Sequence, residues 1–183
     1  MNTLFPSLPN PPDLAAVFGK FPHGAKPLLE FHDIILRGDS PLTPGERELI
    51  AAHVSGLNAC KYCYGAHSTI AKTYGIDIEL IEAMQNDLDS ADIAENLKPI
   101  ITYVSKLTIT PSRMTPSDAQ AVYDAGWNER ALYDAIAACA LFNFMNRLVE
   151  GTGCLPEPKA SGEDSDDSLE SYVSWGREAG FID

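Results

Sequence analysis

The feature that most constrains the fold is a series of helix start and stop signals with no strand pattern between them. Residues 43–46 are the clearest start signal, because Thr43 can cap a helix, Pro44 fits its first position and Glu46 completes a capping box. Residues 115–118 repeat the arrangement with an aspartate in place of the glutamate. No segment alternates convincingly between apolar and polar residues, as a half-buried strand would. The sequence therefore predicts an all-α fold.

The expected helices follow this punctuation. Apolar spacing predicts two early helical stretches around residues 14–18 and 28–36, the second ending at Gly38. A helix over 44–57 and another over 59–74 should follow, with Asn58 capping the second and Gly75 closing it. Later helices are expected at 77–86, 98–109, 116–125, 128–149 and 168–179. We interpret residues 1–183 as one domain, a helical bundle with an extended, proline-rich arm at residues 1–12.

Charge and hydropathy exclude several classes of function. The net charge of −13, from 26 acidic against 13 basic residues, argues against nucleic-acid binding. Much of the excess lies in an acidic stretch at 157–168, expected to be a solvated loop; an acidic docking segment for a basic partner is the alternative. No apolar run approaches the ~18 residues that span a bilayer, and the N-terminus lacks a secretory pattern. We therefore expect a cytoplasmic protein without membrane contact.

Four cysteines are present, and only Cys60 and Cys63 are close in sequence. In a reducing cytosol such a pair is more often catalytic or metal-binding than structural. Cys139 lies in an apolar run and is interpreted as a small core residue. Cys154 follows a glycine-containing turn, and we assign it no role. Chemistry is therefore expected at the pair.

Cys60, Cys63 and His67 should share one face of the helix that begins after Asn58. In the first turn, Cys60 would meet the positive end of the helix dipole, which stabilises a thiolate. The spacing puts the imidazole of His67 within reach of Cys63, and such a pair can exchange a proton. Two sulfurs at this spacing can also close a disulfide. The pattern predicts a redox dithiol.

Glu48 is a candidate partner for His67. It lies near the start of the preceding helix, so antiparallel packing would bring it to the latter half of the thiol helix. A second group that orients the histidine or relays its proton improves a histidine base. The alternative is that Glu48 only complements the dipole of its own helix. Spacing alone leaves these two roles equally supported.

Other interpretations of the same residues are open. The two cysteines and His67 could bind zinc with Glu48 as a fourth ligand, although structural zinc sites usually separate two ligand pairs by a loop. The cysteines could instead be inert core residues, against which the polar Lys61-Tyr62 spacer argues.

The remaining histidines and nearby tyrosines have simpler interpretations. His53 is expected to be a hydrogen-bonded packing residue rather than a partner of the thiols. His23 and His32 have no identifiable partner in the sequence. The tyrosines around the dithiol are expected to pack amphipathically, and these are Tyr62, Tyr64 and Tyr74.

The spacing Glu48-x11-Cys60-x2-Cys63-x3-His67 resembles the signature of the carboxymuconolactone decarboxylase/AhpD-like alkylhydroperoxidase superfamily. The surrounding segments at 27–38, 42–50 and 143–147 are similar to its branch of peroxidase-related proteins. The resemblance covers roughly residues 10–155.

The resemblance implies an AhpD-like helical bundle that assembles into a homo-oligomer, a trimer or hexamer. It implies that Glu48 and His67 relay protons, that Cys63 is deprotonated through them, and that Cys60 and Cys63 cycle between dithiol and disulfide. The type enzymes carry a histidine where this chain has Tyr62, and an ordinary tyrosine, with a pKa near 10, does not titrate in the range of histidine.

The sequence thus predicts a thiol-dependent hydroperoxide reductase that uses no cofactor or metal of its own. Its partners would be a hydroperoxide and an external dithiol. The helix N-terminus favours Cys60 as the attacking thiol, whereas His67 and the resemblance favour Cys63, which we take as the activated one. The alternatives are a carboxymuconolactone decarboxylase-like enzyme, against which the presence of both cysteines argues, and a non-catalytic redox-sensing or zinc-binding oligomer.

Overall fold

The computed structural model describes residues 4–155 and 169–183, and every regular element in these ranges is helical. This confirms the predicted all-α fold. The acidic stretch at 157–168 and the first three residues of the expected arm lie outside the described residues. Residues 4–12 form turns and bends without a helix.

The helices agree with the predicted ones to within a few residues. In chain order they are α1 (Leu14–Lys20), α2 (Ala25–Arg37), α3 (Pro44–Leu57), α4 (Lys61–Thr73), α5 (Ile78–Asn86), α6 (Lys98–Ile109), the 3-10 helix η1 (Pro111–Arg113), α7 (Pro116–Asp124), α8 (Glu129–Thr152) and α9 (Tyr172–Glu178). The helix expected to end near residue 149 continues to Thr152, where Gly153 takes a left-handed conformation with φ 77°.

The two predicted capping boxes are present at the starts of α3 and α7. The backbone N–H of Glu46 donates to the Thr43 hydroxyl oxygen at 3.2 Å, and the Glu46 carboxylate accepts from the Thr43 N–H at 2.7 Å. Asp118 accepts from the N–H of Thr115 in the same way, at 2.7 Å. These reciprocal bonds satisfy donors that the first helical turn leaves unpaired.

The start of α4 differs from the expectation. Cys60, and not Asn58, is the N-cap residue, because Ala59 turns the chain with φ 56°. The side chain of Asn58 instead donates to Asn146 on α8 at 2.9 Å. Cys60 therefore lies directly before the first turn of α4 rather than within it.

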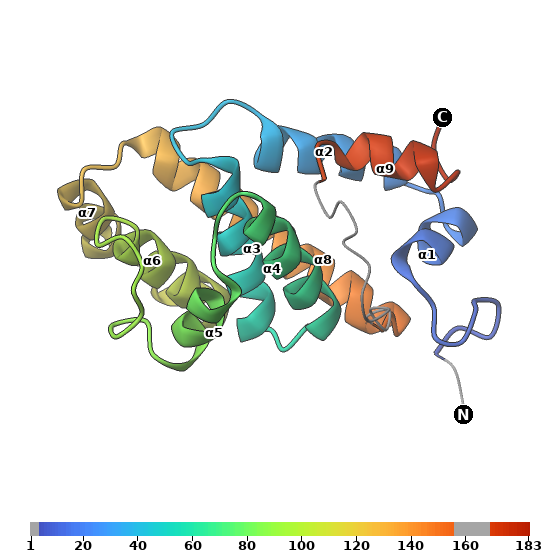
Figure 1. Ribbon diagram of the computed structural model, residues 1–183, viewed down its shortest axis with the longest axis horizontal. Coiled ribbons are helices and arrows are strands. Elements are labelled where there is room, and N and C mark those ends of the chain that lie inside the picture. The colour runs from blue at the N-terminus through green and yellow to red at the C-terminus, as the bar shows by residue number, and fades with distance from the viewer. Residues whose placement is uncertain (1–3, 156–168) are drawn as a thin grey trace.

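Helix α3 forms the centre of the bundle (Figure 1). It packs most extensively against α4 and also against α8, α6 and α5. Its middle is buried on all sides, with the consecutive residues 47–55 all inaccessible. In a helix that is buried all round, each polar side chain needs a hydrogen-bond partner inside the protein. Glu48 and His53 are therefore expected to have such partners.

Helix α9 lies beside α2, although the two come from opposite ends of the chain (Figure 1). The Asp33 carboxylate accepts from the Ser171 hydroxyl at 2.7 Å and from the N–H groups of Tyr172 and Val173 at 2.6 and 3.2 Å. These bonds cap the start of α9. Gly176 lets the helix approach closely, since a Cβ there would lie 2.5 Å from Leu29.

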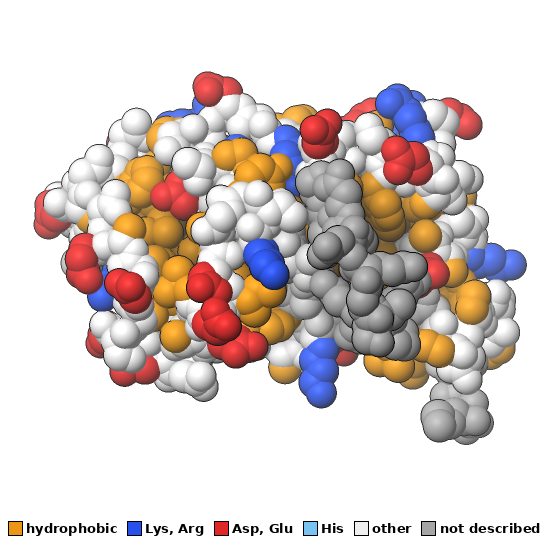
Figure 2. Space-filling model, in the orientation of Figure 1, with side chains coloured by type: hydrophobic (Ala, Val, Ile, Leu, Met, Phe, Trp, Pro, Cys, Tyr) orange, Lys and Arg blue, Asp and Glu red, His pale blue; other side chains and the backbone are white. Residues whose placement is uncertain are grey.

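Acidic side chains are distributed over the surface rather than gathered in one patch on the face seen in Figure 2, and Lys and Arg side chains are fewer. Among the helices that the structure describes, none combines the length and apolar character needed to cross a membrane.

Candidate active site

Glu48 and His67 meet where α3 and α4 pack against each other. Oε2 of Glu48 lies 2.6 Å from Nδ1 of His67, and both residues are buried. Of the two roles that the sequence left open for Glu48, the structure shows the contact with His67. The imidazole also packs edge-on against Phe142 of α8, with ring centroids 4.3 Å apart. Both contacts fix the orientation of the ring.

The other oxygen of Glu48 has two partners that sequence reasoning missed. Oε1 accepts from Arg37 Nη1 at 2.7 Å and from the Tyr172 hydroxyl at 2.9 Å. Burial by itself raises the pKa of the Glu48 carboxyl, but His67 and Arg37 more than offset this and hold the pKa below its usual value. Glu48 is therefore a carboxylate at neutral pH, and it accepts the Nδ1 hydrogen of His67.

Arg37 connects the carboxylate to the C-terminal segment. Its guanidinium lies between the rings of Tyr74 and Tyr172, 5.4 and 5.2 Å from their centroids. Its Nε donates to the backbone carbonyl of Leu169 at 2.9 Å. The residue that neutralises Glu48 therefore also holds the chain that leads into α9. No sequence signal marks this role, since Arg37 looks like an ordinary basic residue in the last turn of α2.

Cys60 and Cys63 lie at the start of α4, and both are buried with free thiols. Hydrogen bonding to the Cys63 thiol and the Cys63 backbone N–H lowers the pKa of Cys60. The Cys60 sulfur and burial raise the pKa of Cys63. The two thiols therefore differ in acidity, with the pKa of Cys60 lowered and that of Cys63 raised.

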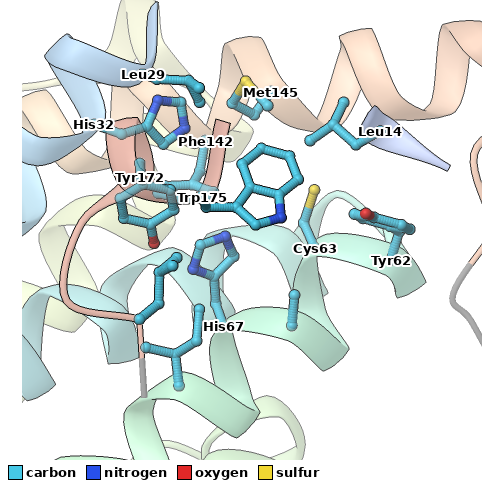
Figure 3. A pocket seen from close by; sticks show the side chains of 13 residues that line it. Leu14, Leu29, His32, Tyr62, Cys63, His67, Phe142, Met145, Tyr172 and Trp175 are labelled. Atoms are coloured by element: carbon cyan, nitrogen blue, oxygen red, sulfur yellow. The ribbon is translucent and has the colours of Figure 1, made fainter. Parts of the chain in front are cut away.

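A cavity of about 200 Å³ lies between α4, α8, α2 and α9 (Figure 3). Its walls are mainly apolar, and Cys63 and His67 line it together. In Figure 3 both side chains point into the cavity, whereas Cys60 is not among the residues that line it. Cys63 is therefore the sulfur that a molecule in the cavity would meet first.

Tyr62, which stands where the type enzymes have a histidine, also lines this cavity. Burial raises its pKa to about 12. It is therefore a neutral phenol at physiological pH and presents aromatic surface and a hydroxyl group rather than a titratable base.

His32 is a cavity residue that sequence reasoning missed. It is 3% exposed and lines the cavity from α2. The His32 ring bonds to the backbone carbonyl of Leu28, one helical turn earlier. No motif in the sequence around His32 indicates a site. His53, by contrast, is the packing residue that the sequence predicted, with Nε2 2.7 Å from the Ser105 hydroxyl.

The donor set does not match a metal site. Within residues 4–155 and 169–183, no three or more His, Cys, Asp or Glu side chains are arranged to hold a metal ion. Glu48, the expected fourth zinc ligand, is already bonded to His67, Arg37 and Tyr172. Cys139 lies in the core beside Thr108, and Cys154 is buried next to Thr152.

Part of the chain matches the model of a known protein family. The model of the carboxymuconolactone decarboxylase family matches residues 22–97, which contain Glu48, both cysteines of the pair and His67. A search of curated proteins found no match.

Three solved structures share the fold. The chain is 25% identical to an uncharacterized peroxidase-related protein from Silicibacter sp. TM1040, covering 75% of this chain and 72% of that one, with a TM-score of 0.69. It is 24% identical to an alkylhydroperoxidase AhpD core protein, also peroxidase-related and uncharacterized, from Ralstonia eutropha JMP134, covering 79% and 76%, with a TM-score of 0.74. A protein of unknown function from Agrobacterium tumefaciens, named for AhpD-type antioxidant defence, is 16% identical, covering 86% and 100%, with a TM-score of 0.68. The resemblance seen in the sequence is confirmed.

Proposed function

We propose that this member of the carboxymuconolactone decarboxylase/AhpD-like superfamily is a thiol-dependent hydroperoxide reductase. One observation carries the proposal: the buried Glu48–His67 pair, with its 2.6 Å hydrogen bond, opens onto the same cavity as Cys63. A charged carboxylate behind Nδ1 leaves the other ring nitrogen of His67 free to accept a proton at the cavity. A second cysteine lies at disulfide spacing next to Cys63.

In the first step, His67 removes the proton of the Cys63 thiol, and Glu48 stabilises the imidazolium that forms. The Cys63 thiolate attacks the terminal oxygen of the hydroperoxide, so that an S–O bond forms and the O–O bond breaks. The products are a Cys63 sulfenic acid and an alkoxide, and His67 returns its proton to the alkoxide to give the alcohol.

In the second step, the Cys60 thiolate attacks the sulfur of the Cys63 sulfenic acid. A disulfide forms, and the hydroxide that leaves takes a proton from solvent to become water. The pKa of Cys60 is held below its ordinary value by hydrogen bonding to Cys63, and a more acidic thiol suits this resolving role. An external dithiol then reduces the disulfide and restores both thiols.

The decarboxylase alternative has weaker support. The family takes its name from a lactone decarboxylase, but that chemistry does not need two cysteines at disulfide spacing. By the same likeness we expect a homo-oligomer, a trimer or hexamer, and analytical ultracentrifugation would measure its size. The cytoplasmic location stays the expectation drawn from the sequence.

The test is hydroperoxide consumption driven by dithiothreitol. We expect Cys60→Ser and Cys63→Ser to abolish turnover and His67→Ala to raise the apparent pKa of the reactive thiol. Cys139→Ser is the matched control, because this third buried cysteine lies outside the cavity lining and a serine can keep its contact with Thr108. Wild-type turnover in either serine variant of the pair would rule out the two-cysteine cycle.

A further inference from the structure

The cavity contains a second imidazole, from His32, whose two nitrogens differ in their surroundings. Nδ1 lies 2.7 Å from the backbone carbonyl of Leu28. Because a carbonyl only accepts, Nδ1 must carry the hydrogen, and a neutral ring then has a lone pair on Nε2. Burial lowers the pKa of His32 to about 4, so the ring is neutral at physiological pH. His32 therefore presents a hydrogen-bond acceptor.

Among the residues that the structure describes, this acceptor has no donor. No residue in the described part of the chain makes a hydrogen bond to Nε2 of His32, although the side chain is almost fully buried. Its neighbours are the rings of Phe142 and Tyr172, with centroids 6.0 and 5.0 Å away. The Tyr172 hydroxyl cannot serve as donor, since it is bonded to Glu48. Nε2 keeps some accessible surface, so a molecule in the cavity can supply the donor.

The rest of the cavity indicates the chemical class of that donor. Figure 3 shows His32 near Tyr172 and Phe142, and in this view Trp175 is drawn between His32 and Cys63. The described residues that line the cavity include no Lys or Arg, and the walls around His32 are apolar, formed by Leu29, Met145 and Trp175. A volume of about 200 Å³ exceeds that of an engineered cavity of about 150 Å³ that binds benzene. An uncharged molecule with a compact hydrocarbon group and one O–H group fits both the walls and the acceptor.

We propose that His32 is a substrate-binding residue, and that its Nε2 accepts a hydrogen bond from the O–H group of a compact, uncharged organic hydroperoxide. This inference rests on the proposed function, and it names the substrate class and the residue that orients it. His32 transfers no proton. It holds the O–H group of the hydroperoxide inside the cavity that Cys63 also lines, and the hydrocarbon group lies against the apolar walls.

The experiment measures binding without turnover. The probe is 2-phenylpropan-2-ol, an unreactive alcohol with a compact hydrocarbon group and one O–H donor. Trp175 lines the cavity and serves as the fluorescent reporter, in a Trp127→Phe background that removes the other tryptophan, whose indole bonds to Asn96. His32→Phe keeps a ring against Tyr172 but removes the acceptor, and His32→Gln restores an acceptor oxygen.

We expect His32→Phe to weaken binding of the alcohol about 3- to 10-fold, which is the range for one hydrogen bond, and His32→Gln to recover most of the affinity. The pH dependence of Cys63 alkylation by iodoacetamide should be the same in all three proteins, because His32 does not belong to the Glu48–His67 relay. Circular dichroism and urea unfolding establish that both variants are folded.

Equal affinity of the wild type and His32→Phe for the alcohol would overturn the inference, as would a loss in His32→Phe that His32→Gln does not reverse. Failure of the proposed function is a separate result. It would be seen as wild-type protein that binds the alcohol through His32 but consumes no cumene hydroperoxide with dithiothreitol, and the assignment of His32 as an O–H acceptor for a compact ligand would still be supported by the binding data.

Discussion

The hydroxyl of Tyr172 donates to Oε1 of Glu48 at 2.9 Å, and this bond joins residues 124 positions apart. Tyr172 is the first residue of α9, and Glu48 lies in the first half of α3. The same carboxylate bonds to His67 through its other oxygen. The last helix of the chain therefore takes part in holding the carboxylate behind the histidine.

Tyr172→Phe removes this hydrogen bond and keeps the aromatic ring. A hydrogen bond to a charged group contributes about 1.5–3 kcal/mol, so we expect a loss of that size in the free energy of unfolding. Urea denaturation at pH 7 measures it. Tyr133→Phe is the control, since Tyr133 is 65% exposed and the substitution should cost at most about 0.5 kcal/mol. Equal losses in the two variants would show that the Tyr172–Glu48 bond contributes no stability.

Glu48→Gln leaves the Arg37 guanidinium, whose side chain is 12% exposed, and the buried His67 without their charged partner. We expect a loss of about 3–5 kcal/mol in the free energy of unfolding at pH 7 and the loss of hydroperoxide turnover. Glu95→Gln, which breaks an exposed ion pair with Lys98, should cost no more than about 1 kcal/mol.

The pH dependence of this difference has a definite sign. The folded-state pKa of Glu48 lies below its ordinary value of 4.5, so its ionised form stabilises the protein fully above about pH 4.5. This contribution is lost as the pH falls below that value. The gap in stability between wild type and Glu48→Gln should therefore narrow in acid, and a gap that stays constant down to pH 3 would contradict the assignment.

Cys60→Ala should lower the pKa of Cys63, because the Cys60 sulfur is the largest cause of its elevation. Conversely, Cys63→Ala should raise the pKa of Cys60, which loses the hydrogen bond that stabilises its thiolate. The rate of alkylation by iodoacetamide as a function of pH, with the modified peptides identified by mass spectrometry, measures both values. Shifts in the same direction in the two variants would disprove the unequal sharing of charge.

His53 contributes to the pH dependence of stability. Burial lowers its folded-state pKa from 6.5 to about 4, so the unfolded chain takes up this proton first as the pH falls. Stability should therefore decrease from about pH 6.5 towards pH 4, by up to about 3 kcal/mol for this residue. In His53→Gln, urea unfolding across this range should show a smaller decrease. His23→Gln changes an exposed imidazole and should leave the wild-type slope in place.

Gly176→Val should loosen the packing of α9 on α2. A Cβ at Gly176 would lie 2.5 Å from Leu29 and 2.9 Å from Ile182, so the helix must move outward, at a cost of about 1–3 kcal/mol. Limited proteolysis of the C-terminal segment and the fluorescence of Trp175 report the movement. Gly151→Val is the control, because no atom lies within 4 Å of a Cβ added there. Equal protease resistance in both variants would show that close packing at Gly176 is not needed.

Much of the fold followed from local signals. The capping residues around Thr43 and Thr115 start their helices in the structure as they do in the sequence, because a cap depends on residues three positions apart. Asn58 was assigned wrongly as a cap, since its side chain bonds instead to Asn146 on α8. A local signal can thus be overridden by a polar partner that only the packed bundle supplies.

The sequence by itself placed Cys60, Cys63 and His67 at one short segment, with Cys60 at the start of a helix and the other two on it, and it offered Glu48 on the preceding helix as a candidate partner of His67. Such relations follow from the helical repeat and from the short turn between α3 and α4. Only the tertiary structure decided which groups complete the site. Arg37 and His32 come from α2 and Tyr172 from α9, and these helices meet through contacts between opposite ends of the chain. The spacing of residues in the sequence does not predict the contact between α2 and α9, because that contact depends on long-range packing.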